Sequence, residues 1–231
     1  MVRLYSIKIE NDEFHKKIGG GLPVGTLALI LGDHGCGKSV LCQRLVFGLL
    51  KNDVTVSYIS TQLTTIEFIK QMLSMGYDII PELIRGKLSF FPVYPLINEI
   101  GEKDEYSKKL ISSRQIFEKE VVVIDSFSSL VKFDVNPELA IELVGFFKRI
   151  TASGKVIILT VLDGELPEEI MEEMESVASL LIETSVKKIG TDLKNVMTIK
   201  KYNFAVFQYS KQTAFRVEPK IGLVVEIAAV A

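Results

Sequence analysis

The chain has 231 residues, of which 48% are apolar and 24% are charged, proportions that are ordinary for a globular protein and exclude a disordered or fibrous one. Its 27 basic and 29 acidic side chains leave a formal net charge of −2, so the composition lacks the basic excess typical of proteins that bind duplex DNA. The two cysteines are too few for a disulfide framework, and no run approaches the roughly 20 apolar residues of a spanning helix. We therefore expect a soluble, cytoplasmic protein with no nucleic-acid partner and no direct membrane insertion.

Short apolar runs alternate with longer amphipathic stretches over most of the chain. The runs that predict strands span residues 26–31, 55–60, 88–92, 121–124 and 156–160. The stretches that predict helices span residues 38–51, 65–75, 137–151 and 168–177, the third introduced by Asn136 and Pro137. Because continuous apolar strands suit a parallel sheet covered on both faces, this alternation predicts an α/β fold, a mostly parallel sheet flanked by helices.

The last part of the chain changes character, because strand-like runs follow one another there with only polar turns between them. These runs span residues 178–184, 195–200, 205–209, 214–218 and 222–226. They predict antiparallel strands added to the sheet at its C-terminal end. No internal repeat, low-complexity tract or Pro/Gly-rich linker divides the chain, so we expect residues 1–231 to form a single domain.

A highly charged segment, residues 98–120, interrupts the apolar pattern and is the one plausible mobile insertion. Its charge pattern is typical of a solvated helix. The alternative interpretation is a surface that meets a neighbouring subunit. The sequence leaves both interpretations open.

The strongest motif spans residues 32–39, Gly-Asp-His-Gly-Cys-Gly-Lys-Ser, which matches G-x-x-x-x-G-K-[ST] between a predicted strand and a predicted helix. Its glycines permit the backbone N–H groups to turn inward and form an anion nest at the positive end of the helix. Lys38 is expected to neutralise the β and γ phosphates, and Ser39 to offer a hydroxyl ligand to Mg²⁺. The motif predicts ATP with Mg²⁺ and the nucleotide-binding residues Asp33, His34, Gly35, Cys36, Gly37, Lys38, Ser39 and Val40.

Two side chains inside this loop carry chemistry of their own. One interpretation gives His34 and Cys36 a catalytic role. The other is that they occupy variable positions of the loop, where only the backbone amide contributes to binding. We favour the second interpretation, because side chains at such positions of a phosphate nest usually point away from the anion.

An apolar strand, residues 121–124, leads directly into Asp125. Ligands of an open α/β sheet bind at the carboxyl ends of the strands, so a carboxylate here is placed to hold Mg²⁺ through water. Taken alone, Asp125 is equally well explained as the cap of a following turn or helix. The phosphate loop favours the magnesium interpretation.

Hydrolysis needs a group that orients and deprotonates the attacking water. The strand that follows the phosphate-loop helix ends in Thr61 and Gln62, a hydroxyl and an amide where an acid would serve. An amide can hold a water molecule but cannot accept its proton at neutral pH. Gln62 is therefore the candidate catalytic residue. Because its side chain is an amide, we expect hydrolysis to be slow.

Residues 18–25, Ile-Gly-Gly-Gly-Leu-Pro-Val-Gly, resemble the Gly-Gly-Leu-Pro-x-Gly run of the RecA-like ATPases of the KaiC type, and the spacing to Asp125 and Ser126 is similar. Within that superfamily the chain most resembles the accessory ATPases of the archaeal flagellum (archaellum) motor. Residues 60–65 and 209–225 are the other matching parts, and the resemblance covers roughly residues 17–226. It implies a RecA-like P-loop NTPase fold.

The resemblance also implies partners and a location. We expect a nucleotide-dependent homo-oligomeric ring, a hexamer, docked at the inner face of the membrane beside the motor's secretion-type ATPase and its membrane platform and scaffold proteins. Relatives of the KaiC type carry a glutamate or a glutamate pair where this chain has Thr61 and Gln62. Their Lys-x-Arg element reaches the neighbouring subunit's γ-phosphate, and the matching positions here are Lys200 and Lys201, with no arginine.

These observations favour an ATP-binding regulatory or assembly component of the archaellum motor, with little or no ATP hydrolysis. The alternative is an active ATPase in which Gln62 positions the water and Lys200 or Lys201 supplies charge across a subunit boundary. A DNA-acting RecA-like ATPase is less favoured, because the chain is slightly acidic and lacks a basic, glycine-rich loop. A small-molecule kinase is the remaining alternative, although no acceptor site or lid motif is visible.

Overall fold

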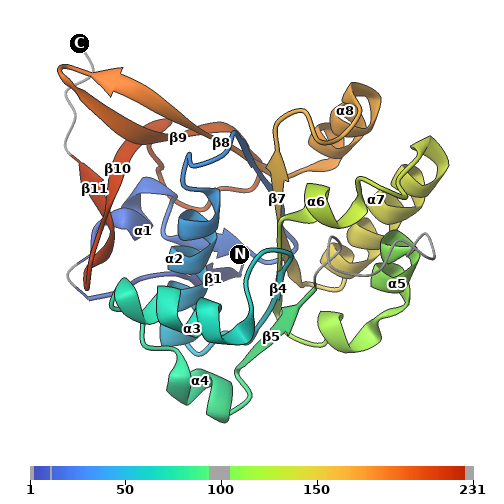
Figure 1. Ribbon diagram of the computed structural model, residues 1–231, viewed down its shortest axis with the longest axis horizontal. Helices are drawn as coiled ribbons and strands as arrows, with labels where there is room; N and C mark the ends of the chain where they lie inside the picture. Colours follow the sequence, from blue (N-terminus) through green and yellow to red (C-terminus); the bar gives the residue numbers. More distant parts are fainter. Residues whose placement is uncertain (1–2, 11, 94–104, 227–231) are drawn as a thin grey trace.

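The computed structural model describes residues 3–10, 12–93 and 105–226. Its centre is a nine-stranded sheet with the order β11-β10-β9-β8-β3-β7-β6-β4-β5 (Figure 1). The strands are β3 (Leu27–Gly32), β4 (Val56–Ser60), β5 (Leu88–Pro92), β6 (Val121–Asp125), β7 (Val156–Leu162), β8 (Leu180–Ile189), β9 (Asp192–Tyr202), β10 (Gln212–Glu218) and β11 (Gly222–Glu226).

Helices cover both faces of this sheet, as the sequence predicts. The longer ones are α2 (Lys38–Lys51), α3 (Thr65–Ser74), α7 (Pro137–Ala152) and α8 (Glu168–Val177). Helices α2 and α3 bury Leu45 and Phe68 on one face, whereas α7 and α8 bury Leu143 and Ile170 on the other, which makes two separate cores (Figure 1). Both faces of the central strands are therefore apolar, as the continuous apolar runs require.

Local signals set where two of the helices begin. Thr64 caps α3 in a capping box, because its side chain accepts from the Glu67 N–H and the Glu67 carboxylate accepts from Thr64. Asn136 caps α7, with Pro137 at the first helical position. The predicted starts of both helices are confirmed.

The direction of the strands divides the sheet into two parts. Strands β4, β5, β6, β7 and β8 share one direction with β3, and β9, β10 and β11 add to β8 in antiparallel order. The predicted antiparallel extension is confirmed, but it begins one strand later than predicted. The strand expected at residues 178–184 runs parallel to β3, because the chain reaches it from β7 through α8, a crossover that returns the chain in the same direction.

The strand predicted at residues 205–209 is wrong, since these residues form an irregular connection between β9 and β10. Pairing of β10 with β9 starts only at Gln212. The connection is held elsewhere, because the Ser210 N–H donates to the Lys17 carbonyl over 2.9 Å and the Phe207 carbonyl lies against Gly19. These contacts to Lys17 and Gly19 place the segment away from β9, so an apolar run that resembles a strand does not pair as one.

Several short elements are not predicted individually from the sequence. They are β1 (Leu4–Ser6), α1 (Phe14–Lys17), β2 (Gly21–Pro23), α4 (Ile80–Ile84), α5 (Tyr106–Ser112) and α6 (Phe127–Val131). Of these, α5 lies within the segment for which the charge pattern indicates a helix. Strands β1 and β2 pair with each other in a separate two-stranded sheet. None of the helices in the described ranges is long and apolar enough to cross a membrane.

The charged segment at residues 98–120 is described only from residue 105 onward, and residues 98–104 lie outside the described part. The described portion contains α5, with Leu110 buried, and a 3₁₀ turn, Arg114–Phe117. Ser107 bonds the Asp134 carboxylate through both its N–H and its hydroxyl, each over 2.9 Å. This portion is a helix with solvated positions that is nevertheless attached to the body of the protein.

Candidate nucleotide-binding site

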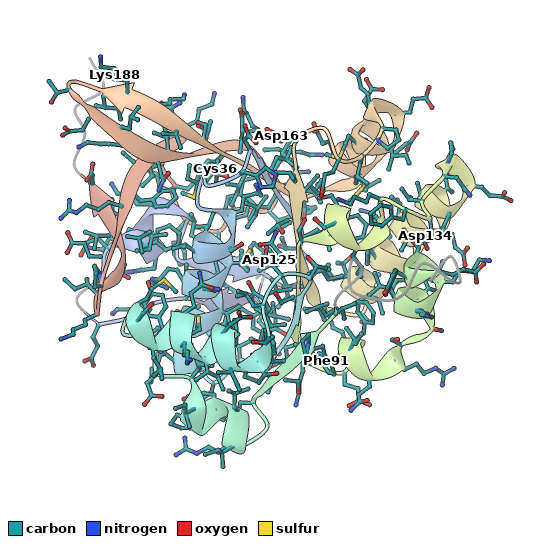
Figure 2. The ribbon with its side chains drawn as sticks, viewed as in Figure 1. Cys36, Phe91, Asp125, Asp134, Asp163 and Lys188 are labelled. Carbon is teal, nitrogen blue, oxygen red and sulfur yellow. The ribbon has the colours of Figure 1, made fainter. Side chains whose placement is uncertain are left out.

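A pocket of about 230 Å³ lies where β3, β4, β6 and β7 end at their carboxyl edge. The residues that line it are Asp33, His34, Gly35, Cys36, Gly37, Lys38, Ser39, Val40, Gln62, Asp125, Ser126, Ser129 and Leu162. Figure 2 shows Cys36 near the start of α2 and Asp125 at the end of β6. Every predicted loop residue, Gln62 and Asp125 therefore meet at one edge of the sheet.

The loop between β3 and α2 has the backbone that an anion nest requires. Gly35 and Gly37 have φ angles of +72° and +92°, which side-chain-bearing residues rarely adopt. A Cβ at Gly37 would lie 2.8 Å from the Phe215 ring, and a Cβ at Gly32 would overlap the Thr184 carbonyl. Glycine is therefore required at positions 32 and 37 for space as well as for conformation, and at position 35 for conformation alone.

Lys38 folds back over the loop that precedes it. Its Nζ donates to the carbonyl oxygens of Gly32 over 2.6 Å and of Asp33 over 2.7 Å. The side chain is partly exposed and lines the pocket. The ammonium group thus sits at the mouth of the nest, held by acceptors that a phosphate oxygen can replace.

The two loop side chains with chemistry of their own are placed differently. Cys36 is buried, and its Sγ lies 2.7 Å from the Asp33 carbonyl and 2.9 Å from the Thr184 hydroxyl. His34 is exposed, and its N–H donates to the Asp33 carboxylate over 2.6 Å. Cys36 therefore fastens the loop to β8.

Asp125 is nearly buried and accepts hydrogen bonds from three hydroxyl groups. Ser39 and Thr160 donate to Oδ1 over 3.2 Å and 2.8 Å, and Tyr58 donates to Oδ2 over 2.7 Å. Burial and the nearby Asp125 charge raise the pKa of the Tyr58 phenol, so it remains a neutral donor. The alternative that Asp125 is a cap is wrong, because Ser126 is the N-cap of α6.

Gln62 reaches the same pocket from the end of β4. Its N–H and that of Leu63 point to the Ser60 hydroxyl over 3.3 Å and 3.0 Å, which shapes a tight turn after the strand. The neighbouring Thr61 hydroxyl accepts from the Ser126 N–H over 3.0 Å. The ends of β4 and β6 are thereby joined, with the Gln62 side chain exposed to the pocket.

Lys200 and Lys201 lie on β9, and neither lines the pocket of its own chain as far as the structure describes it. Lys200 pairs with Glu183 over 2.6 Å, and Lys201 donates to the Ser176 carbonyl over 2.9 Å. A contact of either lysine with nucleotide in a neighbouring subunit stays a prediction.

Comparison with known proteins gives one consistent result. The family model described as the KaiC ATPase matches residues 7–226. The archaeal flagellar ATP-binding protein FlaH of Methanocaldococcus jannaschii is 48% identical over 100% of this chain and 99% of its own length, and FlaH of Methanococcus voltae is 40% identical over 97% and 98%. The chain belongs to the FlaH family of KaiC-like ATPases.

Solved structures agree with this assignment to the FlaH family. The crystal structure of the flagellar accessory protein FlaH from M. jannaschii superimposes with a TM-score of 0.92 at 48% identity, covering 98% of this chain and 100% of that one. A KaiC-like protein from Pyrococcus horikoshii gives a TM-score of 0.75 at 20% identity, covering the same shares of the two chains, and supports the fold. The predicted KaiC-like, RecA-like fold is confirmed.

Several residues of this FlaH-family site escape sequence reasoning. Tyr58 and Thr160 lie inside predicted strands, so nothing marks them as partners of Asp125. Ser126, Ser129 and Leu162 line the pocket as well. The only available signal is position, because all of these residues lie in or just after strands that end at the same edge.

One further carboxylate lies just beyond the pocket. Glu165 accepts from the hydroxyls of Ser128 and Ser129 over 2.7 Å and 2.8 Å and pairs with Lys132 over 2.7 Å. Partial burial raises its pKa, but the hydrogen bonds from Lys132 and the two serines outweigh burial and lower the pKa overall. Glu165 is therefore a firmly ionised structural anchor for the loop after β7.

Proposed function

We propose that this chain binds ATP with Mg²⁺ at residues 32–39 and acts as a regulatory or assembly component of the archaeal flagellar motor, with little or no ATP hydrolysis. The observation that carries the proposal is the pocket itself, which combines Lys38 and Asp125 with an amide, Gln62, at the place of a catalytic acid. The name of its relatives, archaeal flagellar ATP-binding protein, supports the same assignment.

The donor set fits magnesium. The Ser39 hydroxyl and the Asp125 carboxylate lie 3.2 Å apart in the pocket, and Mg²⁺ prefers oxygen ligands while it retains several waters. Ser39 would bind the ion directly and Asp125 would hold it through water. When bound, Mg²⁺ would neutralise part of the charge on the β and γ phosphates.

Slow hydrolysis follows from the carboxylates near the pocket. Among the described residues that line it, only Asp33 and Asp125 are acids. Asp125 already accepts from three hydroxyls, and Asp33 accepts from the His34 N–H of its own loop. Glu165 is tied to Lys132 and is a weak base because its pKa is lowered. The strand end at which Gln62 lies therefore offers an amide, and the described acids near the pocket are Asp33 in the phosphate loop, the hydrogen-bonded Asp125 and the ion-paired Glu165.

Assembly belongs to the same proposal. We infer a homo-oligomeric ring, a hexamer, at the inner face of the membrane next to the motor's secretion-type ATPase and its platform and scaffold proteins. The support is the flagellar role in the names of the relatives and the position of Lys200, whose ion pair with Glu183 lies on the surface. A γ-phosphate can order segments at such a boundary and switch it.

The test combines two measurements on the purified chain. Calorimetric titration with ATP in the presence of Mg²⁺ should show tight binding, while ADP release should stay below about one turnover per second, the low end of typical enzymes. Faster release would contradict the regulatory role. Absence of ATP binding would refute the whole proposal.

The second candidate function is an active ATPase, and the observation that favours it is the exposure of the Gln62 side chain to the pocket. A glutamine orients the attacking water in some GTPases. If this function is correct, Gln62→Ala should lower ADP release by at least about tenfold while ATP affinity is retained. An unchanged rate would remove Gln62 from the mechanism.

A further inference from the structure

Both oxygens of Asp125 are held by buried hydroxyl groups from the two strands that flank β6. Tyr58 on β4 donates to Oδ2 and Thr160 on β7 donates to Oδ1. The Tyr58 and Thr160 residues are each 0% exposed, and neither is among the described residues that line the pocket. Their hydroxyls therefore act on the carboxylate and not on a ligand in the pocket.

These two bonds decide which way the carboxylate faces. The last torsion of an aspartate side chain is broad and roughly two-fold, so an unrestrained carboxylate samples many orientations. Here Tyr58 and Thr160 approach from opposite sides, because β6 lies between β4 and β7. They leave Oδ1 directed at the Ser39 hydroxyl, 3.2 Å away.

The Tyr58 hydroxyl is itself fixed by the packing of its ring. The ring centroid lies 4.9 Å from that of Phe68 on α3 and 6.0 Å from that of Phe90 on β5. The two phenylalanine rings stack on each other with centroids 4.3 Å apart. This aromatic layer restricts the ring, so the hydroxyl meets Asp125 at little further entropic cost.

We propose that Tyr58 and Thr160 are positioning residues for magnesium, because they hold the Asp125 carboxylate with Oδ1 facing the Ser39 hydroxyl, where the two groups would hold the ion together. This inference rests on the proposed function, since it concerns the same ATP·Mg²⁺ site. Partners that orient a metal-binding group typically change metal affinity by about 10- to 100-fold when they are removed. The two hydroxyls therefore set the Mg²⁺ concentration at which the site fills.

The chain offers clean variants for the test. Tyr58→Phe keeps the ring in the aromatic layer and removes only the hydroxyl, and Thr160→Val removes the other hydroxyl with similar volume. Tyr77→Phe is the matched control, because Tyr77 is also buried and stacked, on Phe47 at 4.6 Å. Its hydroxyl accepts from the Leu223 N–H over 2.8 Å and has no bond to Asp125.

The experiment measures the binding of a fluorescent ATP analogue by anisotropy, first in EDTA and then over a Mg²⁺ titration. We expect Tyr58→Phe and Thr160→Val each to raise the Mg²⁺ midpoint about tenfold. Affinity for the analogue in EDTA should equal that of the wild type, and Tyr77→Phe should keep the wild-type midpoint.

Two results overturn the inference while the proposed function stands. One is a wild-type Mg²⁺ midpoint in both hydroxyl-deleted variants. The other is an equal loss of affinity with and without Mg²⁺, which would mean that the hydroxyls support only the fold of the pocket. A wild-type chain that binds no analogue at all overturns the proposed function and this inference together.

Discussion

The ammonium group of Lys38 donates to the carbonyl oxygens of Gly32 and Asp33 and, over 3.8 Å, to the Cys36 sulfur, all within its own loop. Charge-assisted bonds to phosphate are roughly twice as strong as bonds between a neutral donor and a neutral acceptor, so an incoming polyphosphate competes well for this donor. The backbone of Gly35 and Gly37 already has the positive φ angles of a nest. The site is therefore formed in advance, and individual side chains decide what it does with the nucleotide.

Lys38→Ala should weaken ATP binding by at least about 100-fold, since each charge-assisted hydrogen bond contributes about 1.5–3 kcal/mol. Isothermal titration calorimetry with ATP and Mg²⁺ measures the change. Lys51→Ala is the control, because Lys51 lies at the opposite end of the same helix, over the Phe47 ring. A Lys38→Ala variant with wild-type affinity would contradict the assignment of the loop.

Asp125→Asn should raise the Mg²⁺ concentration needed for ATP binding more than it changes affinity in EDTA. The amide keeps the shape of the side chain but loses the charge that holds the ion's water. A Mg²⁺ titration of ATP binding, with the wild type alongside, gives both quantities. Equal effects in the two conditions would show that Asp125 acts on the nucleotide or the fold instead of on the ion.

Gln62→Glu should raise ATP turnover by at least about tenfold, because it places a carboxylate where the chain has an amide, and general bases contribute about 10²- to 10⁴-fold. The measurement is phosphate release at saturating ATP and Mg²⁺, with Gln62→Ala as the comparison. A rate as slow as that of the wild type would show that the missing base is not what limits hydrolysis.

At the scale of secondary-structure elements, one buried cation joins the N-terminal segment to α2. Arg44 is 0% exposed, and it bonds the Asp12 carboxylate over 2.7 Å and the Ile7 carbonyl over 3.2 Å. Its guanidinium also lies over the Phe14 ring, 5.2 Å from the centroid. Residues that precede the phosphate loop in the sequence thus contact Arg44 and stabilise the position of α2, the helix that follows the loop.

Arg44→Ala should destabilise the chain by about 3–5 kcal/mol, because breaking a buried pair leaves its partners without compensation. Urea unfolding followed by circular dichroism measures the free energy of unfolding. The control is Lys16→Ala, whose pair with Glu13 is exposed and should leave the urea midpoint unchanged. A similar urea midpoint in both variants would show that the Arg44 contacts do not stabilise the fold.

At the scale of the whole molecule, the pocket lies at the edge formed by β3, β4, β6 and β7, and the antiparallel strands β9, β10 and β11 extend the sheet to one side. Phe215 of β10 lies against Gly37, and Thr184 of β8 bonds Cys36. Strands β8 and β10 therefore contact the phosphate loop directly.

ATP with Mg²⁺ should both stabilise the chain and change its mass. At a ligand concentration of 100 Kd, binding to the folded state alone contributes about 2.7 kcal/mol to the free energy of unfolding. Thermal unfolding measures this contribution, and light scattering after size exclusion should show a hexamer with ATP. Lys38→Ala should show neither effect, and an unchanged wild-type mass would contradict nucleotide-dependent assembly.

The sequence by itself determined the parts of this protein that are contiguous along the chain. Some features depend only on neighbours within a few residues, so the sequence pattern alone predicts them. They are the phosphate loop at residues 32–39, the strand end at Asp125 and the starts of α3 and α7. The alternation of buried strands and helices likewise indicated the parallel sheet, because burial on both faces demands continuous apolar runs.

Only the tertiary structure decided which distant residues meet. The Tyr58 and Thr160 hydroxyls reach Asp125 because the strand order places β6 between β4 and β7. Residues 205–209 form a strand-like apolar run, yet this segment makes contacts with Lys17 and Gly19 and has an irregular conformation. The local sequence pattern indicates which secondary structures a segment can form. Long-range packing and hydrogen bonding determine which of them it adopts in the folded protein.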